Sequence, residues 1–278
     1  MHPEALMVFI KAAAAALAAW LCGGGALAQG AAGGAANACV NFVSSAEPRV
    51  MLADFRLADL SRDQMSITFV GHSTFLIESQ AGVRAATDYN DYIKPKAVPD
   101  IATMNIAHDT HFSHHPDPAI KHVLRGWDRA GGQALHDVIM QDMRVRNVTT
   151  NIRGFGLDRP DGNSIFVFEM AGLCVAHLGH LHHELTPGHL KELGQIDIVL
   201  APVDGSWTLD LDGMMDVLHQ LQPKAIIPMH YFSGATLERF LSKARERGYP
   251  VERREAPKMI VSRDTLPAKT SVIVLPGR

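Results

Sequence analysis

Three histidine-rich segments interrupt this chain, and each directly follows an apolar run with the character of a β-strand. They are residues 108–115, residues 177–183 and the single His230 in Pro228-Met229-His230-Tyr231. Loops at strand ends are held by a rigid sheet, so side chains from distant segments can meet there. Neutral imidazole is the commonest protein ligand for zinc and similar ions. The pattern therefore predicts a sheet-based fold that gathers histidines into a metal site.

The strand-like segments follow one another along the chain, with two clear helices among them. Residues 66–78 alternate around Gly71-His72-Ser73, which predicts two adjacent strands joined by that turn. Further strands are expected at residues 83–87, 101–107, 164–169, 173–177, 196–202, 225–230 and 271–275. The spacing of apolar residues predicts helices over 214–221 and 236–247. Two similar halves of this kind favour two sheets packed face to face with helices outside.

Residues 1–28 have the pattern of a secretory signal peptide. Lys11 precedes an apolar stretch over 12–21, and the small-residue ending Ala26-Leu27-Ala28 follows. The apolar core of about ten residues is shorter than the roughly twenty that a membrane-spanning helix needs, so no permanent membrane anchor is expected. An uncleaved N-terminal anchor is the alternative. Residues 29–38 are expected to form a flexible leader and residues 39–278 one domain, which predicts a periplasmic or secreted protein.

The composition of the chain narrows the function classes. A formal net charge of −3, without any lysine- and arginine-rich stripe, argues against nucleic acid as a partner. The chain contains no phosphate-binding loop, no dinucleotide fingerprint, no G-x-S-x-G nucleophile elbow and no Cys-x-x-Cys pair. Cys39 and Cys174 follow the predicted cleavage site, and an oxidising compartment permits them to pair. The sequence leaves open whether they do, and it leaves the oligomeric state open as well.

Several motifs, taken in order, resemble those of the metallo-β-lactamase-fold hydrolases. They are Gly71-His72-Ser73-Thr74-Phe75-Leu76-Ile77-Glu78, Asp88, the His108 segment, Leu178-Gly179 with residues 197–202, and Ile227-Pro228-Met229-His230-Tyr231. The resemblance covers residues 66–233 and is nearest to the branch with ascorbate-phosphate lactonase-like proteins. It implies an α/β fold, a four-layer αββα sandwich of two mixed β-sheets flanked by helices. It also implies a hydrolase that uses a metal-activated water on a small-molecule ester, lactone, amide or phosphoester.

The chain departs from this family at its acidic metal ligands. The family's loop H-x-H-x-D-H corresponds here to a segment from His108 to His114 with an inserted Thr110, so that Ser113 stands where the family has an aspartate. The family's later Gly-Asp, whose carboxylate bridges two ions, is here Gly179-His180. Residues 147–156 contain no histidine, although the family usually has a ligand there. These departures argue against a dinuclear zinc centre and favour one ion of zinc or another late first-row divalent metal.

The resemblance implies roles for individual residues. The predicted metal ligands are His108, His111, His180 and His230, with His114 as a further candidate and His182 and His183 as replacements or neighbours. His72 and Asp88 are expected beside the metal, where a carboxylate accepts the free N–H of a ligating imidazole. His72, Asp88 and His183 are therefore the predicted catalytic residues. Asp109, Asp117, His182 and His183 all remain candidates for the general base.

Three alternatives stay open at the level of the sequence. A non-catalytic metal-binding or sensing protein that keeps the fold would also explain the missing acidic ligands. Alternatively, the histidines serve only as polar loop residues, and His72 and Asp88 serve only the turns in which they stand. Trp207 is expected either to line the pocket as an apolar wall or to be a buried loop aromatic.

Overall fold

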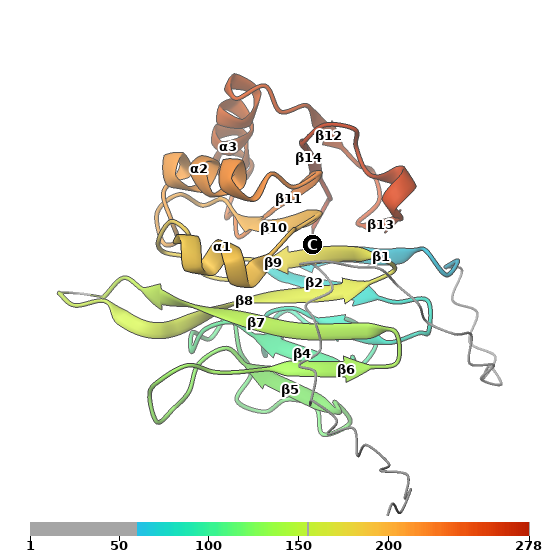
Figure 1. Ribbon diagram of the computed structural model, residues 1–278, viewed down its shortest axis with the longest axis vertical. Coiled ribbons are helices and arrows are strands. Elements are labelled where there is room, and N and C mark those ends of the chain that lie inside the picture. Colours follow the sequence, from blue (N-terminus) through green and yellow to red (C-terminus); the bar gives the residue numbers. More distant parts are fainter. Residues whose placement is uncertain (1–59, 155, 278) are drawn as a thin grey trace, which may run out of the picture. The chain divides into compact units, whose positions relative to one another are not determined.

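A computed structural model describes residues 60–154 and 156–277 of the chain (Figure 1). It contains two mixed β-sheets with three α-helices, which confirms the predicted fold class. The predicted signal peptide, the predicted leader and Cys39 lie outside the described residues, so those predictions stand untested. None of the helices in the described ranges has the length and apolar character needed to span a membrane.

The first sheet has six strands in the order β13-β1-β2-β3-β4-β5. Its strands are β1 Met65–Gly71, β2 Thr74–Glu78, β3 Arg84–Ala86, β4 Ile101–Met104, β5 His122–Arg125 and β13 Lys258–Val261. Strands β1 and β2 form the predicted antiparallel hairpin, with Phe69 opposite Phe75 and a register shift before Gly71. Strands β3, β4 and β5 run parallel, so the loops that follow β3 and β4 leave the sheet at the same edge.

The second sheet has eight strands in the order β12-β14-β11-β10-β9-β8-β7-β6. Its strands are β6 Asp137–Met140, β7 Met143–Ile152, β8 Arg159–Met170, β9 Leu173–His177, β10 Ile198–Pro202, β11 Ala225–Met229, β12 Val251–Arg253 and β14 Ser271–Val274. Strands β9, β10 and β11 are parallel, and the residues 178–183, 203–208 and 230–233 follow them at one edge. The sequence predicted the central strands of this sheet but not β6, β7 or β12.

The helices are α1 Pro187–Leu193, α2 Leu211–Leu221 and α3 Gly234–Glu246, with a short 3-10 helix η1 at Arg263–Thr265. Asp210 and Ser233 cap the N-termini of α2 and α3 by accepting backbone N–H groups, which satisfies donors that have no partner inside a helix. Figure 1 shows the three α-helices grouped beside β9, β10 and β11. Their apolar side chains, such as Met214 and Phe240, join the core on that face of the sheet. Helix α1 was not predicted from the sequence.

Two apolar layers hold the sheets. The core between them contains Phe75 of the first sheet and Phe166 and Phe168 of the second, all fully buried. The opposite face of β3 and β4 is covered in the described residues by loop side chains, among them Phe112 and Trp127. This apolar support leaves the polar strand ends free to serve a site rather than the core.

Candidate metal centre

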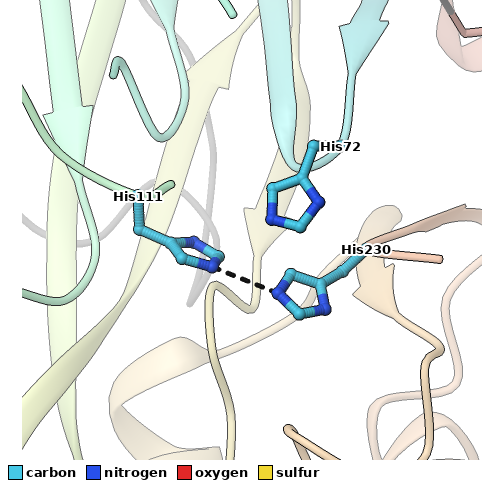
Figure 2. Close-up of side chains that lie close together, drawn as sticks. All are labelled: His72, His111 and His230. Carbon is cyan, nitrogen blue, oxygen red and sulfur yellow. Dashed lines mark hydrogen bonds between the residues drawn. The ribbon is translucent and has the colours of Figure 1, made fainter. Parts of the chain in front are cut away.

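Three histidines from distant parts of the chain converge at the strand ends (Figure 2). His72 comes from the turn between β1 and β2, His111 from the loop after β4, and His230 directly follows β11. One ring nitrogen of each lies within 4.8 Å of the corresponding nitrogens of the other two. The Nε2 atoms of His111 and His230 are 3.1 Å apart. We call His72, His111 and His230 the histidine triad.

The backbone is strained at this site. His72, Asp88 and His230 have φ angles of 52°, 42° and 55°, in the left-handed region that residues other than glycine rarely adopt. Such conformations cost on the order of 1–3 kcal/mol each and persist only where the surroundings hold them. The backbone N–H of His230 donates to the carbonyl of His72 at 2.8 Å, which ties the end of β11 to the β1–β2 turn. Three of the residues with this conformation therefore lie at the strand ends around the triad.

Asp88, which follows β3, supports His111. Its Oδ2 is 2.5 Å from His111 Nδ1, and its Oδ1 accepts the backbone N–H of Asn105 at 3.0 Å. Asp88 is fully buried, and burial raises the pKa of its carboxyl group, while the neighbouring His177 and the N–H of Asn105 act to lower it. This is the contact expected of Asp88 from the sequence: when Nδ1–H of His111 donates to the carboxylate, Nε2 becomes the lone-pair atom.

Asp204, two residues after β10, supports His230 in the same way. Its Oδ1 lies 3.0 Å from His230 Nδ1, and its Oδ2 accepts the backbone N–H groups of Ser206, Trp207 and Thr208. Burial acts to raise the pKa of Asp204, but the hydrogen bonds from His230 and Thr208 hold that pKa below its usual range. The sequence analysis missed Asp204. The available signal was its position immediately beyond a strand end, the position that also distinguishes Asp88.

Burial keeps His72 and His111 neutral. It lowers the pKa of His72 to about 3 and that of His111 well below the ordinary value of 6.5, and neighbouring histidines lower both further. Neutral imidazole is the form that binds metal ions.

The triad fits a divalent metal ion. When neutral His111 and His230 each donate Nδ1–H to Asp88 and Asp204, their Nε2 atoms, 3.1 Å apart, both present lone pairs to the space between them. In addition, Nε2 of His72 is buried without a hydrogen-bond partner among the described residues. Lone pairs so close repel unless a cation accepts them, and an unpaired buried polar atom is costly. Three imidazole nitrogens are a donor set that suits zinc and similar ions.

His180 and His108 lie beside the triad but outside the close group. The ring of His180 is 4.9 Å from that of His111 and 5.0 Å from that of His230, centre to centre. Its Nδ1 is 2.6 Å from Nε2 of His182. His108 is exposed, with its ring 5.8 Å from that of His111. Both line the same pocket as His72 and His230.

Other predicted site residues lie farther out. The side chain of His114 is 61% exposed and lies 3.9 Å from Asp109, so the structure does not bring it to the triad. Ser113, at the family's aspartate position, donates to Asp91. His183 pairs with Asp158 at 3.2 Å and does not line the pocket. Neither Asp109 nor Asp117 contacts the triad in the described residues, and the general base remains unassigned.

A pocket of about 700 Å³ is lined by His72 and His230 of the triad. Trp207 and Phe232, 69% and 63% exposed, form an apolar part of its wall, and Arg153 contributes a cation. The ring of Phe232 lies 5.6 Å from that of His72 and 5.3 Å from that of His230. No acidic residue lines this pocket within the described part of the chain. Of the two expectations for Trp207, the geometry favours a place in the pocket wall over burial in a loop.

Comparisons with known proteins agree with this geometry. The model of the beta-lactamase superfamily domain matches residues 66–230. The chain is 27% identical over 220 residues to a UPF0173 metal-dependent hydrolase of Opitutus terrae, covering 67% of this chain and 95% of that protein. A structure from Thermotoga maritima, described as a zinc-dependent hydrolase of the metallo-beta-lactamase superfamily, is 29% identical. It superposes with a TM-score of 0.58 and covers 77% of this chain and all of its own.

A third comparison supports the fold alone. A metal-dependent hydrolase from Parabacteroides distasonis has a TM-score of 0.54 at 16% identity, covering 77% of this chain and 94% of its own. The matched family segment begins in β1 and ends at His230, so it contains all three triad histidines together with Asp88 and Asp204. The chain therefore belongs to the beta-lactamase superfamily and is a metal-dependent hydrolase with the metallo-β-lactamase fold.

Proposed function

We propose that this hydrolase works with one zinc ion, or another late first-row divalent ion, held by the histidine triad. The observation that carries the proposal is the convergence of three imidazoles, two of which have Nδ1 within hydrogen-bond distance of a buried carboxylate. Nitrogen-only donors suit zinc rather than magnesium or calcium, which prefer oxygen. The close group contains no carboxylate to bridge a second ion in the described residues, which supports a single ion. Of the ligands predicted from the sequence, His111 and His230 belong to this set.

The protein's own side chains prepare the site. Asp88 and Asp204 fix the tautomers of His111 and His230 and increase the basicity of their Nε2 atoms. An ion so held, when bound, lowers the pKa of water and polarises a carbonyl or phosphoryl oxygen. The strained backbone at His72 and His230 keeps their rings directed into the pocket rather than into the sheets. Trp207 and Phe232 hold the apolar part of a substrate and limit access of bulk water.

The substrate that fits is a small molecule with a hydrolysable ester, lactone, amide or phosphoester group. A pocket of about 700 Å³ lies within the range typical of small-molecule sites, roughly 300–1,000 Å³. Its lining combines apolar rings with Arg153 and lacks acidic residues, which favours a substrate with an apolar portion and an oxygen that carries negative charge.

Export to the periplasm or medium is part of the proposal. It is supported by the signal-peptide pattern of residues 1–28, with Lys11, the apolar stretch and Ala26-Leu27-Ala28. N-terminal sequencing of the protein from the periplasmic or secreted fraction should begin at Gln29. A product that starts at Met1 and stays in the membrane fraction would contradict export.

Metal content and hydrolysis, measured on the same preparations, test the function. The full chain should bind one zinc per protein by elemental analysis and hydrolyse at least one of a lactone, a 4-nitrophenyl ester and a bis(4-nitrophenyl) phosphate. His111→Ala and His230→Ala should lose both the metal and the activity. His219→Ala, on the exposed face of α2, is the matched control and should keep both.

The same experiment separates the alternative. A protein that binds zinc tightly through the triad, yet leaves every probe intact with zinc, manganese or iron added, would be the non-catalytic metal-binding or sensing protein. Unchanged zinc content in both alanine variants would contradict the triad itself.

A further inference from the structure

A chain of hydrogen bonds fixes the proton of His180. The backbone N–H of Arg153 donates to His182 Nδ1 at 2.9 Å, and a backbone amide nitrogen cannot accept in return. Neutral His182 therefore carries its proton on Nε2, and this atom lies 2.6 Å from His180 Nδ1. His180 Nδ1 must accept that hydrogen bond. In neutral His180 the remaining proton consequently sits on Nε2.

This tautomer is the reverse of the one at the triad. His111 and His230 present Nε2 lone pairs because their Nδ1–H groups donate hydrogen bonds to carboxylates. His180 presents an Nε2–H because its Nδ1 accepts a hydrogen bond from another imidazole. An N–H group cannot bind a metal ion without losing its proton. The ring nitrogens of His180 also lie outside the group of atoms within 4.8 Å of one another.

The backbone holds His180 rigidly beside the triad. Its own N–H donates to Asn163 Oδ1 at 3.0 Å. Gly179 before it has φ 61°, and an added Cβ there would lie 2.1 Å from Asn105 Nδ2, so only glycine fits. His180 is 8% exposed and lines the pocket.

We propose that His180 is a catalytic hydrogen-bond donor rather than a metal ligand: its Nε2–H stabilises the substrate oxygen that gains negative charge during hydrolysis at the triad. The inference rests on the proposed function. His182 is a positioning residue that holds His180 in the donor tautomer, and the amide of Arg153 holds His182. Fixed donors directed at a developing oxyanion in a partly dry site typically contribute about 10²–10³ in kcat.

The position makes this role chemically reasonable. His180 stands where the resembling family carries an aspartate, and a carboxylate there would repel a negatively charged oxygen unless a second cation neutralised it. A neutral N–H donor needs no second ion. It therefore agrees with a single-ion site and with a pocket lining that lacks acidic residues in the described part of the chain.

Paired substitutions in the zinc-loaded full chain test the donor. In His180→Leu, zinc per protein should stay at the parent value, while kcat on the probe that the parent hydrolyses falls about 100-fold with KM little changed. His180→Gln keeps an N–H near the position of Nε2 and should recover about tenfold of that loss. His182→Leu should also lower kcat at full zinc, and His182→Gln, whose amide can still donate to His180, should restore most of it. His219→Leu on α2 is the matched control.

A direct measurement of the tautomer supplements the kinetics. The ¹⁵N imidazole shifts of His180 should show a protonated Nε2 and an unprotonated Nδ1, both with and without zinc. Zinc bound to Nε2 of His180, or loss of zinc in both His180 variants, would overturn the inference while leaving the proposed function intact. A fall in kcat of less than about tenfold in His180→Leu would also overturn it. If the parent binds zinc but hydrolyses no probe, the proposed function fails, and the inference fails with it.

Discussion

Neighbouring histidines at this site have hydrogen-bond partners of opposite kinds. His111 and His230 contact buried carboxylates through Nδ1, which leaves their Nε2 atoms with lone pairs. His180 contacts a second imidazole through Nδ1, which leaves its proton on Nε2. The rings are close and burial keeps His111 and His180 neutral, so neither distance nor charge distinguishes them. Under the proposed assignment, the hydrogen-bond partner behind each imidazole decides whether the ring acts as a ligand or as a donor.

Removing charge from the carboxylates should produce the largest effect on this comparison. In Asp88→Asn and Asp204→Asn the imidazole keeps an acceptor but loses the negative charge that makes Nε2 basic, so zinc affinity should fall about 10–100-fold. Competition with a chromophoric chelator measures it. Asp91→Asn, which removes a carboxylate bonded to Ser113 instead of an imidazole, should leave the affinity unchanged. Equal losses in all three variants would mean that a general change of charge, and not the contact with imidazole, is responsible.

Replacing the hydrogen-bond partner of His180 by a carboxylate should give His180 the tautomer of His111 and His230. In His182→Asp a carboxylate would accept from His180 Nδ1, which leaves a lone pair on Nε2 as in the triad. We expect kcat to fall about tenfold or more, as for loss of an oxyanion donor, while zinc affinity stays equal or increases. Parallel measurements of kcat and of zinc affinity check this. If kcat is retained, the tautomer of His180 has no part in the reaction.

The metal-free protein should lose stability as the pH falls below about 6.5. Unfolded histidines bind protons near pH 6.5, whereas His72 and His180 in the folded protein stay neutral until about pH 3 and 2. The unfolded state thus binds more protons in this window, and the free energy of unfolding decreases by up to about 1.4 kcal/mol per pH unit for each such histidine. Asp88, whose pKa burial raises, takes up a proton in the folded state and partly opposes the loss.

Urea unfolding between pH 7 and pH 4.5 measures this slope. His72→Gln and His180→Gln should each reduce it by a similar amount, although only the first should reduce zinc binding. A slope that is unchanged in both variants would show that these rings do not resist protonation in the folded protein.

Removing part of the apolar pocket wall should have the smallest effect on the kinetics. Trp207→Ala removes an exposed ring that lines the pocket without touching the triad or its carboxylates through its side chain. Loss of part of a hydrophobic contact corresponds to a rise in KM of roughly tenfold or less, with zinc content and kcat near parent values. Steady-state kinetics on the probe that is hydrolysed gives both constants. A change in zinc content instead would place Trp207 in the support of Asp204, to which its backbone N–H donates.

Much of the fold was predictable because it depends on local patterns. The β1–β2 hairpin, β9 and the central strands β10 and β11 have apolar runs with clear ends, and all were predicted. Strands β5, β6, β7, β12 and β13 and helix α1 were not predicted. These elements carry partly exposed or polar residues, so their apolar pattern is weak, and strand pairing decides their conformation.

The site was predictable in part. His111 and His230 were predicted ligands, and Asp88 was expected to support an imidazole. His114 was expected at the metal because it stands at a histidine position of the family's metal loop, but its side chain is 61% exposed. Asp204 was not considered, because nothing local links it to His230, 26 positions away.

By itself, the sequence determined the central strands, the family and the places where histidines follow strand ends, because these depend on the periodicity and order of residues. Only the tertiary structure decided which rings meet and which proton each ring carries. His111 and His230 are separated by 119 positions and are brought together by the packing of two sheets. The tautomers depend on Asp88, Asp204 and the amide of Arg153, which reach the rings only after that packing. A hydrogen bond depends on position and direction in space, and the same histidine can therefore serve as a ligand or as a donor.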